Sequence, residues 1–219
     1  DLTVEDLISE EDRVVTISHS GYAKTQPLSD YQSQHRGGTG KSATAVKDDD
    51  FVEHLLIAST HSTILCFTNV GKVYWLKVYQ IPVAGRNSKG RPMINLLPLD
   101  ENERINSILP VSEYDKNKYI VMATANGTVK KTSLDQYSRP RSVGLRAVDL
   151  VEGDYLVGSA ITDGNSDVML FSSEGKAVRF SESDVRSVGR VSKGVRGMRL
   201  PAEHKVLSMI IPADNGYAL

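Results

Sequence analysis

The sequence predicts an all-β protein built from about four propeller-like blades, each with four short strands. The first observation is a repeat: turns that end in glycine recur at Gly21, Gly71, Gly127 and Gly175, which are 50, 56 and 48 residues apart. The second is that short runs rich in Val, Ile, Leu and Thr flank these turns. The third is that no segment keeps a helical period over ten residues, apart from a turn expected near SDYQSQ. Short strands in repeats of about fifty residues are typical of blades.

Each of the four units is expected to supply four strands. The expected ranges are 14–19, 22–27, 42–46 and 54–59 in the first unit, and 63–68, 72–78, 93–97 and 104–111 in the second. They are 118–124, 128–133, 146–150 and 155–161 in the third, and 167–172, 176–181, 195–200 and 205–211 in the fourth. We expect one domain over 1–219, with blades at about 12–60, 61–124, 125–166 and 167–212, and the start of a truncated fifth blade at 213–219.

The composition is that of an ordinary globular chain, with a net charge of −1, 40% apolar residues and 24% charged residues. The first residues, DLTVEDLISEEDR, are acidic and lack the order of a signal peptide, and the longest apolar runs are too short to span a membrane. The single cysteine, Cys66, lies in the run ILCF and is expected to be a buried structural thiol. These features predict a cytoplasmic location.

The positive charge follows the repeat. Four segments, 34–41, 84–96, 138–148 and 186–200, occupy the same place in the four units and contain no Asp or Glu. They hold 13 of the 26 basic residues, namely Arg36, Lys41, Arg86, Lys89, Arg91, Arg139, Arg141, Arg146, Arg186, Arg190, Lys193, Arg196 and Arg199. Basic loops that recur in one register predict a track for a polyanion, although the chain as a whole is nearly neutral.

The segment QHRGGTGKS, residues 34–42, ends like a nucleotide-binding P-loop but does not satisfy that motif. A P-loop needs a glycine where His35 stands, a buried strand before it and a helix after it. Glycine also lets backbone N–H groups approach a phosphate closely, and arginine adds a planar fork of donors. The segment is therefore expected to contact the phosphates of a nucleic-acid backbone.

Two further groups of residues leave alternatives open. Basic residues that follow the turn glycines either extend the polyanion track or are exposed strand residues: Lys24, Lys72, Lys130, Lys131, Lys176 and Arg179. Tyr74, Trp75 and Tyr79 either stack on bases or pack in the core, and the alternation of KVYWLKV favours packing.

The repeats and the segment QHRGGTG resemble the C-terminal domain of the DNA gyrase A subunit, part of a type IIA topoisomerase. The likeness runs from VEDLISEEDR through MATANGTVKKTSL to GVRGMRL. The family has a box of glutamine, two arginines, two glycines, a basic residue and glycine. Gln34, Arg36, Gly37, Gly38 and Gly40 match this box, while His35 and Thr39 replace two of its basic residues and Lys41 follows it.

The resemblance implies a β-pinwheel, of which this chain would hold four of six blades as a fragment. It implies that a basic outer rim binds, bends and wraps double-stranded DNA without reading its sequence, in support of negative supercoiling. The implied partners are the rest of the gyrase A subunit, together with the B subunit, in a heterotetramer of the cytoplasm that is associated with the nucleoid. The catalytic tyrosine and the ATP and Mg sites would lie elsewhere in that enzyme, so no cofactor is expected in this chain.

The resemblance and the charge pattern together give a set of expected DNA-binding residues. They are Gln34, His35, Arg36, Gly37, Gly38, Gly40, Lys41, Arg86, Lys89, Arg91, Arg139, Arg141, Arg146, Arg190, Lys193 and Arg196. No catalytic or metal site is expected, because the five histidines show no ligand spacing and no partnered nucleophile. The alternatives are the C-terminal domain of topoisomerase IV, which guides the choice of DNA substrate, and a propeller that serves as a protein-interaction platform.

Overall fold

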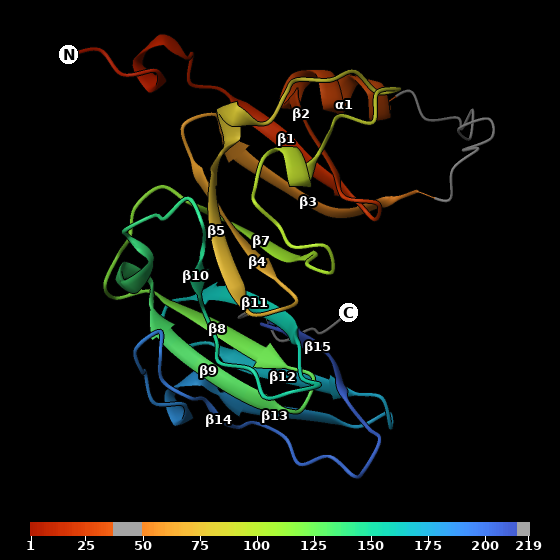
Figure 1. Cartoon of the computed structure of the whole chain (residues 1–219), viewed down its shortest axis with the longest axis vertical. Helices are drawn as coiled ribbons and strands as arrows, with labels where there is room; N and C mark the ends of the chain where they lie inside the picture. The colour runs from red at the N-terminus through yellow and green to blue at the C-terminus, as the bar shows by residue number, and fades with distance from the viewer. Residues whose placement is uncertain (37–49, 214–219) are drawn as a thin grey trace. The chain divides into compact units, whose positions relative to one another are not determined.

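The computed structural model describes residues 1–36 and 50–213, which form an all-β fold as expected (Figure 1). The strands in chain order are β1 Asp12–Ser18, β2 Tyr22–Pro27, β3 Val52–Ser59, β4 Thr63–Thr68, β5 Lys72–Lys77, β6 Arg91–Pro92, β7 Ile105–Val111, β8 Tyr119–Thr124, β9 Thr128–Ser133, β10 Leu145–Arg146, β11 Leu156–Thr162, β12 Asp167–Ser172, β13 Ala177–Ser181, β14 Val195–Arg196 and β15 Val206–Ile210. The helices are α1 Leu28–Arg36 and the 3-10 turns η1 Glu5–Leu7, η2 Val78–Gln80, η3 Met93–Asn95, η4 Leu134–Tyr137 and η5 Glu182–Asp184.

The strands form four antiparallel sheets that share strands between repeats. The sheet orders are β3-β1-β2-β6, β10-β5-β4-β7, β11-β8-β9-β14 and, within the described residues, β13-β12-β15. The edge strands β6, β10 and β14 each come from the repeat that follows in the sequence. The assignment of all four strands to one unit was therefore wrong for the third and fourth units, because the third strand of each joins the preceding sheet. In the second unit the donated strand is β6, which lies just before the run expected at 93–97. The predicted strand 42–46 lies outside the described residues.

The donated strands are only two residues long, which is shorter than the runs expected at 93–97, 146–150 and 195–200. The first of these runs instead forms the turn η3 directly after β6. A strand of two residues offers no alternation that sequence reasoning can detect. Strand β8, Tyr119–Thr124, pairs with β9 and β11, so it belongs to the sheet of the third repeat although the expected blade boundary falls after residue 124.

A glycine precedes each donated strand, and before β6 and β14 it lets the chain approach the neighbouring backbone closely. A Cβ on Gly90, where φ is +87°, would lie 2.2 Å from the carbonyl oxygen of Ala23 on β2. A Cβ on Gly194 would lie 2.4 Å from the carbonyl oxygen of Val129 on β9. Contacts this short cannot accommodate a side chain, so the absence of a Cβ at these two glycines permits the pairing between repeats.

The four turn glycines have the conformation that tight turns demand. Their φ angles are +88° at Gly21, +82° at Gly71, +90° at Gly127 and +82° at Gly175. Each N–H also donates a hydrogen bond to the carbonyl oxygen three residues before it. The turns predicted from the repeat are therefore confirmed.

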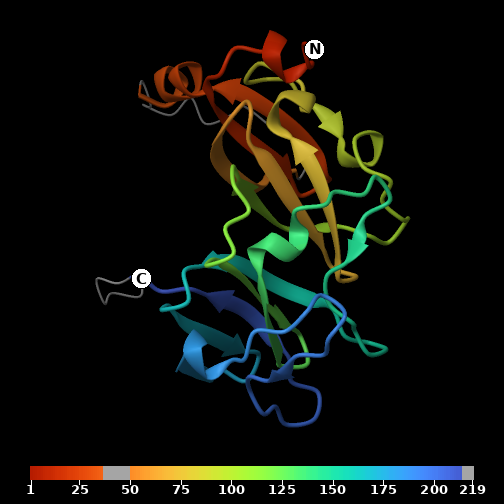
Figure 2. The same ribbon diagram turned by 90° about the vertical axis from the view of Figure 1, so that its left-hand side faces the viewer.

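The helix α1 is a difference from the expected turn at SDYQSQ, because it runs over nine residues and lies beside β1 and β2 (Figure 1, Figure 2). None of its residues is buried. Its large apolar side chains are Leu28 and Tyr31 alone, so it lacks a repeated hydrophobic period, which explains why the sequence indicated only a turn. Asp30 in the first turn and Arg36 in the last complement the helix dipole.

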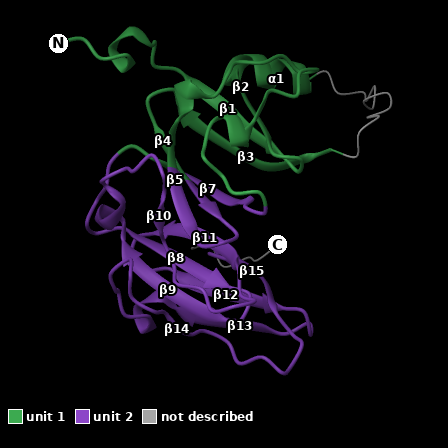
Figure 3. Ribbon diagram, in the orientation of Figure 1, with its two compact units in different colours: residues 1–65, 75–101, 110–112 green, residues 66–74, 102–109, 113–219 purple. Residues whose placement is uncertain are grey.

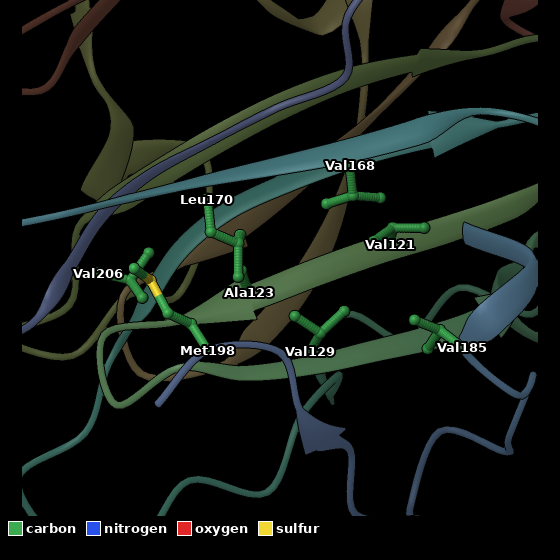
Figure 4. Packing of buried hydrophobic residues seen from close by; sticks show 8 residues of the cluster. All are labelled: Val121, Ala123, Val129, Val168, Leu170, Val185, Met198 and Val206. Atoms are coloured by element: carbon green, nitrogen blue, oxygen red, sulfur yellow. The ribbon is translucent and has the colours of Figure 1, made fainter. Parts of the chain in front are cut away.

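The chain divides into two compact units, shown in separate colours in Figure 3. Unit 1 comprises 1–65, 75–101 and 110–112, and unit 2 comprises 66–74, 102–109 and 113–219. In unit 2 a hydrophobic cluster joins β8, β9 and β12 to the segments beside them (Figure 4), and consists of Val121, Ala123, Val129, Val168, Leu170, Val185, Met198 and Val206. Within the described residues, no helix has the length and apolar character needed to cross a membrane.

Two predictions about individual side chains are confirmed. Cys66 is fully buried, and burial raises the pKa of its thiol to about 12, so the thiol stays protonated. Tyr74 is only 1% exposed and donates a hydrogen bond to the buried carboxylate of Glu103 at 2.8 Å. The Tyr74 ring therefore packs in the core of unit 2 instead of forming a base-stacking surface.

Candidate nucleic-acid interface

In unit 1 the segment 84–91 displays three basic side chains toward solvent. Arg86, Lys89 and Arg91 are all exposed. The ammonium of Lys89 lies 5.7 Å from the centre of the Tyr22 ring on β2. This segment ends in the donated strand β6, so pairing with β2 fixes the position of the loop at one end.

Lys24 on β2 holds the other part of the same loop. Its Nζ donates hydrogen bonds to the main-chain oxygens of Gly85, Arg86 and Ser88 at 3.1, 3.2 and 2.9 Å. An ammonium has three N–H donors, and these three carbonyls use all of them. Partial burial lowers the pKa of Lys24 below its usual value.

The end of α1 also belongs to unit 1 and carries the described part of the glycine-rich box. Gln34 is half-buried and accepts a hydrogen bond from the side-chain amide of Gln26 at 3.3 Å. His35 and Arg36 are exposed, and the His35 ring stacks on Tyr31 with centroids 4.1 Å apart. These three residues lie in the last turn of a helix rather than in a loop as expected. The remaining predicted contacts, Gly37, Gly38, Gly40 and Lys41, lie outside the described residues.

In unit 2 the segment 138–146 exposes Arg139, Arg141 and Arg146. The Arg146 guanidinium lies 3.5 Å from the Asp149 carboxylate, in an exposed pair that contributes little to stability. Next to the donated strand β10, Gly144 packs against the Tyr74 ring so closely that a Cβ would lie 2.7 Å from Cε1. Tyr74 thus has the same place relative to this loop that Lys24 has in unit 1, three residues after a turn glycine.

The segment 186–196 of unit 2 is held from the same register position. Lys130 lies three residues after Gly127, is 1% exposed, and donates hydrogen bonds to the main-chain oxygens of Ala147, at 2.9 Å, and of Arg190. Lys193 and Arg196 are exposed, whereas Arg190 is half-buried. Its Nε is buried without a hydrogen bond. Arg190 is therefore less accessible than the other arginines of these segments.

The stability of the protein is expected to depend on pH through Lys130. Burial, followed by the nearby charge of Arg190, lowers the pKa of Lys130 from 10.5 to about 8. Between pH 8 and pH 10.5 the unfolded state then binds more protons than the folded state, so the free energy of unfolding rises with pH across this window. We expect wild type to gain about 1 kcal/mol relative to Lys130→Met between neutral pH and pH 10, measured by urea unfolding. Parallel pH curves for the two proteins would contradict the prediction.

Lys131 and Glu182 form a buried ion pair in unit 2. The Lys131 ammonium lies 3.4 Å from the Glu182 carboxylate and donates a hydrogen bond to the Glu182 main-chain oxygen at 3.1 Å. The carboxylate also accepts hydrogen bonds from the Thr162 hydroxyl and the Ser166 N–H, at 2.9 and 2.8 Å. Lys131 is only 6% exposed and is committed to this network.

Sequence reasoning therefore located exposed arginines but misjudged some lysines. Lys24, Lys130 and Lys131 follow the turn glycines, yet each binds main-chain oxygens instead of lying free on a strand. Lys176 and Arg179 are exposed, and each lies close to a carboxylate. Lys24 and Lys130 both stand three residues after a turn glycine, and this shared position could have indicated a shared role. The segment that each lysine contacts depends on the exchange of strands between repeats, which the sequence did not indicate.

The comparisons with known proteins agree with this architecture. The sequence matches the family described as "DNA gyrase C-terminal domain, beta-propeller" at 12–59, 62–112, 118–163 and 166–213. The chain belongs to this DNA gyrase C-terminal domain family. It is 57% identical to the DNA gyrase A subunit of Salmonella typhimurium and 54% identical to that of Escherichia coli, over all of its 219 residues. It spans about a quarter of the length of these relatives, 25% in each case.

Solved structures of two members of this structural group are also similar. The C-terminal domain of DNA topoisomerase IV has a TM-score of 0.78 and 31% identity, over 94% of this chain and 62% of that chain. The DNA gyrase A C-terminal domain has a TM-score of 0.69 and 25% identity, over 91% of this chain and 64% of that chain. The β-pinwheel fold class is thereby confirmed. Among the described residues, no cluster of three or more His, Cys, Asp or Glu side chains is arranged to hold a metal ion.

Proposed function

We propose that the basic segments bind the backbone of double-stranded DNA without reading its sequence, and that they bend or wrap the duplex. The observation that carries this proposal is the exposure of basic side chains in segments free of acids at the same place in successive repeats. They are Arg36, Arg86, Lys89, Arg91, Arg139, Arg141, Arg146, Arg186, Lys193, Arg196 and Arg199. Membership of the gyrase family supports the same role.

Electrostatics sets the expected affinity. If each of the four sequence repeats supplies about two phosphate contacts, the logarithm of the binding constant should fall against the logarithm of the salt concentration with a slope near −7. A duplex has a persistence length of about 150 base pairs, so a tight wrap costs several kcal/mol that the phosphate contacts must offset. Contacts of this kind fix the position of the duplex but carry no sequence information.

In the proposed setting the chain acts as the DNA-wrapping part of gyrase and supports negative supercoiling. Its partners would be the rest of the A subunit, together with the B subunit, in a heterotetramer associated with the nucleoid. Catalysis, ATP and Mg would belong to other parts of that enzyme. A second role, guiding DNA substrates as the C-terminal domain of topoisomerase IV, is favoured by the TM-score of 0.78 to that domain.

The test of wrapping is topological. The chain is incubated with relaxed circular DNA, a topoisomerase that relaxes free supercoils is added, the protein is removed, and the linking number is read on a gel. We expect a shift that grows with protein concentration. No shift, with salt-dependent binding intact, would reduce the role to bending or tethering.

A matched pair of variants tests which arginines bind. Arg141→Ala should weaken binding about equally on all sequences and reduce the magnitude of the salt slope by about 0.9, because it removes one phosphate contact. Arg179→Ala removes the same charge from an exposed arginine that lies 2.8 Å from Asp167, outside the acid-free segments, and should leave binding unchanged. Equal losses in both variants would assign binding to net charge rather than to these segments.

A further inference from the structure

Two lysines make the same contact in two different repeats. Arg86 and Arg190 each lie fifteen residues after a turn glycine, Gly71 and Gly175 respectively. The main-chain oxygen of Arg86 accepts a hydrogen bond from Lys24 at 3.2 Å, and that of Arg190 accepts one from Lys130. Lys24 and Lys130 in turn lie three residues after the turn glycines of the preceding repeats. The contact therefore recurs from one repeat to the next in fixed register.

We propose that Lys24 and Lys130 are positioning residues that hold the basic loop of the following repeat in the conformation that meets DNA. This inference rests on the proposed function, because it assigns the lysines a part in the same interface. Neither lysine would touch a phosphate. Each acts through the arginine and lysine side chains of the loop that it holds.

The geometry at Lys24 supports this role over direct contact with DNA. Three carbonyls converge on one ammonium and leave it no free donor for a phosphate oxygen. They belong to Gly85, Arg86 and Ser88, so they span the part of the loop that carries Arg86 and leads to Lys89. Because these carbonyl dipoles point at Lys24, their negative ends do not face an approaching phosphate.

The residues at the equivalent position of two other repeats also support positioning over direct contact with DNA. Lys130 is 1% exposed, which excludes it from direct contact with a duplex in this conformation. At the corresponding position of the second repeat the chain has Tyr74, which is also buried and packs against Gly144 of the next basic loop. Two lysines and a tyrosine thus occupy one register position, and each of them contacts the neighbouring loop.

The first test needs no DNA. Lys24→Met keeps the apolar stem and removes the three donors, so amide hydrogen exchange at 84–90 should become faster in the free protein. Lys176→Met removes the same charge from an exposed lysine and should not alter exchange in this segment. Unchanged exchange at 84–90 in Lys24→Met would overturn the proposal, whatever the protein does with DNA.

The second test is a double-mutant cycle on a linear duplex. Lys24→Met should weaken binding about fivefold in the wild-type background. In a background that already carries Arg86→Ala and Lys89→Ala it should weaken binding less than about twofold, because the side chains that it positions are gone. Additive losses would mean that Lys24 binds phosphate itself and would overturn the proposal.

A charge-conserving variant guards against a folding defect in Lys24→Met. Lys24→Arg keeps the charge, but a planar guanidinium does not match three carbonyls that converge on a compact ammonium. It should also weaken binding, and wild-type affinity in this variant would count against positioning. If the wild-type chain does not bind the duplex at all, the proposed function fails, while hydrogen exchange still decides whether Lys24 holds the loop.

Discussion

Replacing Gly90 with alanine is expected to lower the free energy of unfolding by at least about 3 kcal/mol. Two costs add at this position. The φ of +87° disfavours any side chain, and the new Cβ would lie 2.2 Å from the carbonyl oxygen of Ala23. Relief of this contact requires the donated strand β6 to move away from β2. Urea unfolding followed by circular dichroism measures the loss.

Gly21 provides the matched control, because it lies in the same unit with a φ of +88° and no atom within 4 Å of the place that a Cβ would occupy. Gly21→Ala therefore carries only the backbone cost of about 1–2 kcal/mol. The difference between the two variants isolates the close approach of β6 to β2. Equal destabilisation would show that the strand exchange tolerates a methyl group at this contact.

Replacing Glu182 with alanine is expected to destabilise the protein by about 3 kcal/mol or more, because it leaves the Lys131 ammonium buried without its counter-ion. Glu182 is fully buried, and the substitution also removes the acceptor of the Thr162 and Ser166 hydrogen bonds. Asp167→Ala, which breaks the exposed pair with Arg179, should cost less than about 1 kcal/mol. Thermal unfolding of the three proteins compares these losses.

The source of the loss at Glu182 can be separated by a second substitution. Adding Lys131→Met to Glu182→Ala removes the unpaired charge, so the double variant is expected to be more stable than Glu182→Ala alone. A double variant less stable than either single one would mean that the lost hydrogen bonds, rather than the buried charge, dominate.

The sequence predicted the parts of the fold that depend on local chemistry. The positive φ at Gly21, Gly71, Gly127 and Gly175 follows from the turns in which they stand, and most of the long strands beside them carry enough Val, Ile and Leu to be recognised. Exposure of most arginines in these segments was also predictable, since the segments themselves contain no Asp or Glu; Arg190, which is half-buried, is the exception. These features need only a few neighbouring residues to be understood.

The remaining features depend on contacts between distant parts of the chain. Strand β6 spans only Arg91–Pro92, and no property of two residues indicates that they pair with Tyr22 and Ala23, about seventy positions earlier. The buried state of Lys130 follows from that same exchange, because the carbonyl of Arg190 that it binds arrives with the next repeat. The helix α1 was expected only as a turn, because it buries no residue.

The exchange of strands also bears on how such a chain could grow or shrink in evolution. Each interior repeat contains a strand edge that accepts the donated strand of the next repeat and a short strand that it donates to the preceding repeat. In the third repeat these are β9 and β10. Gene duplication of one repeat would copy both halves together, so a new blade could join the row without a change to its neighbours. Loss of a repeat would likewise bring the donated strand of the following repeat to the strand edge of the preceding one. The number of blades could thus change by whole repeats, while a break inside a repeat would separate a donated strand from the sheet edge with which it pairs.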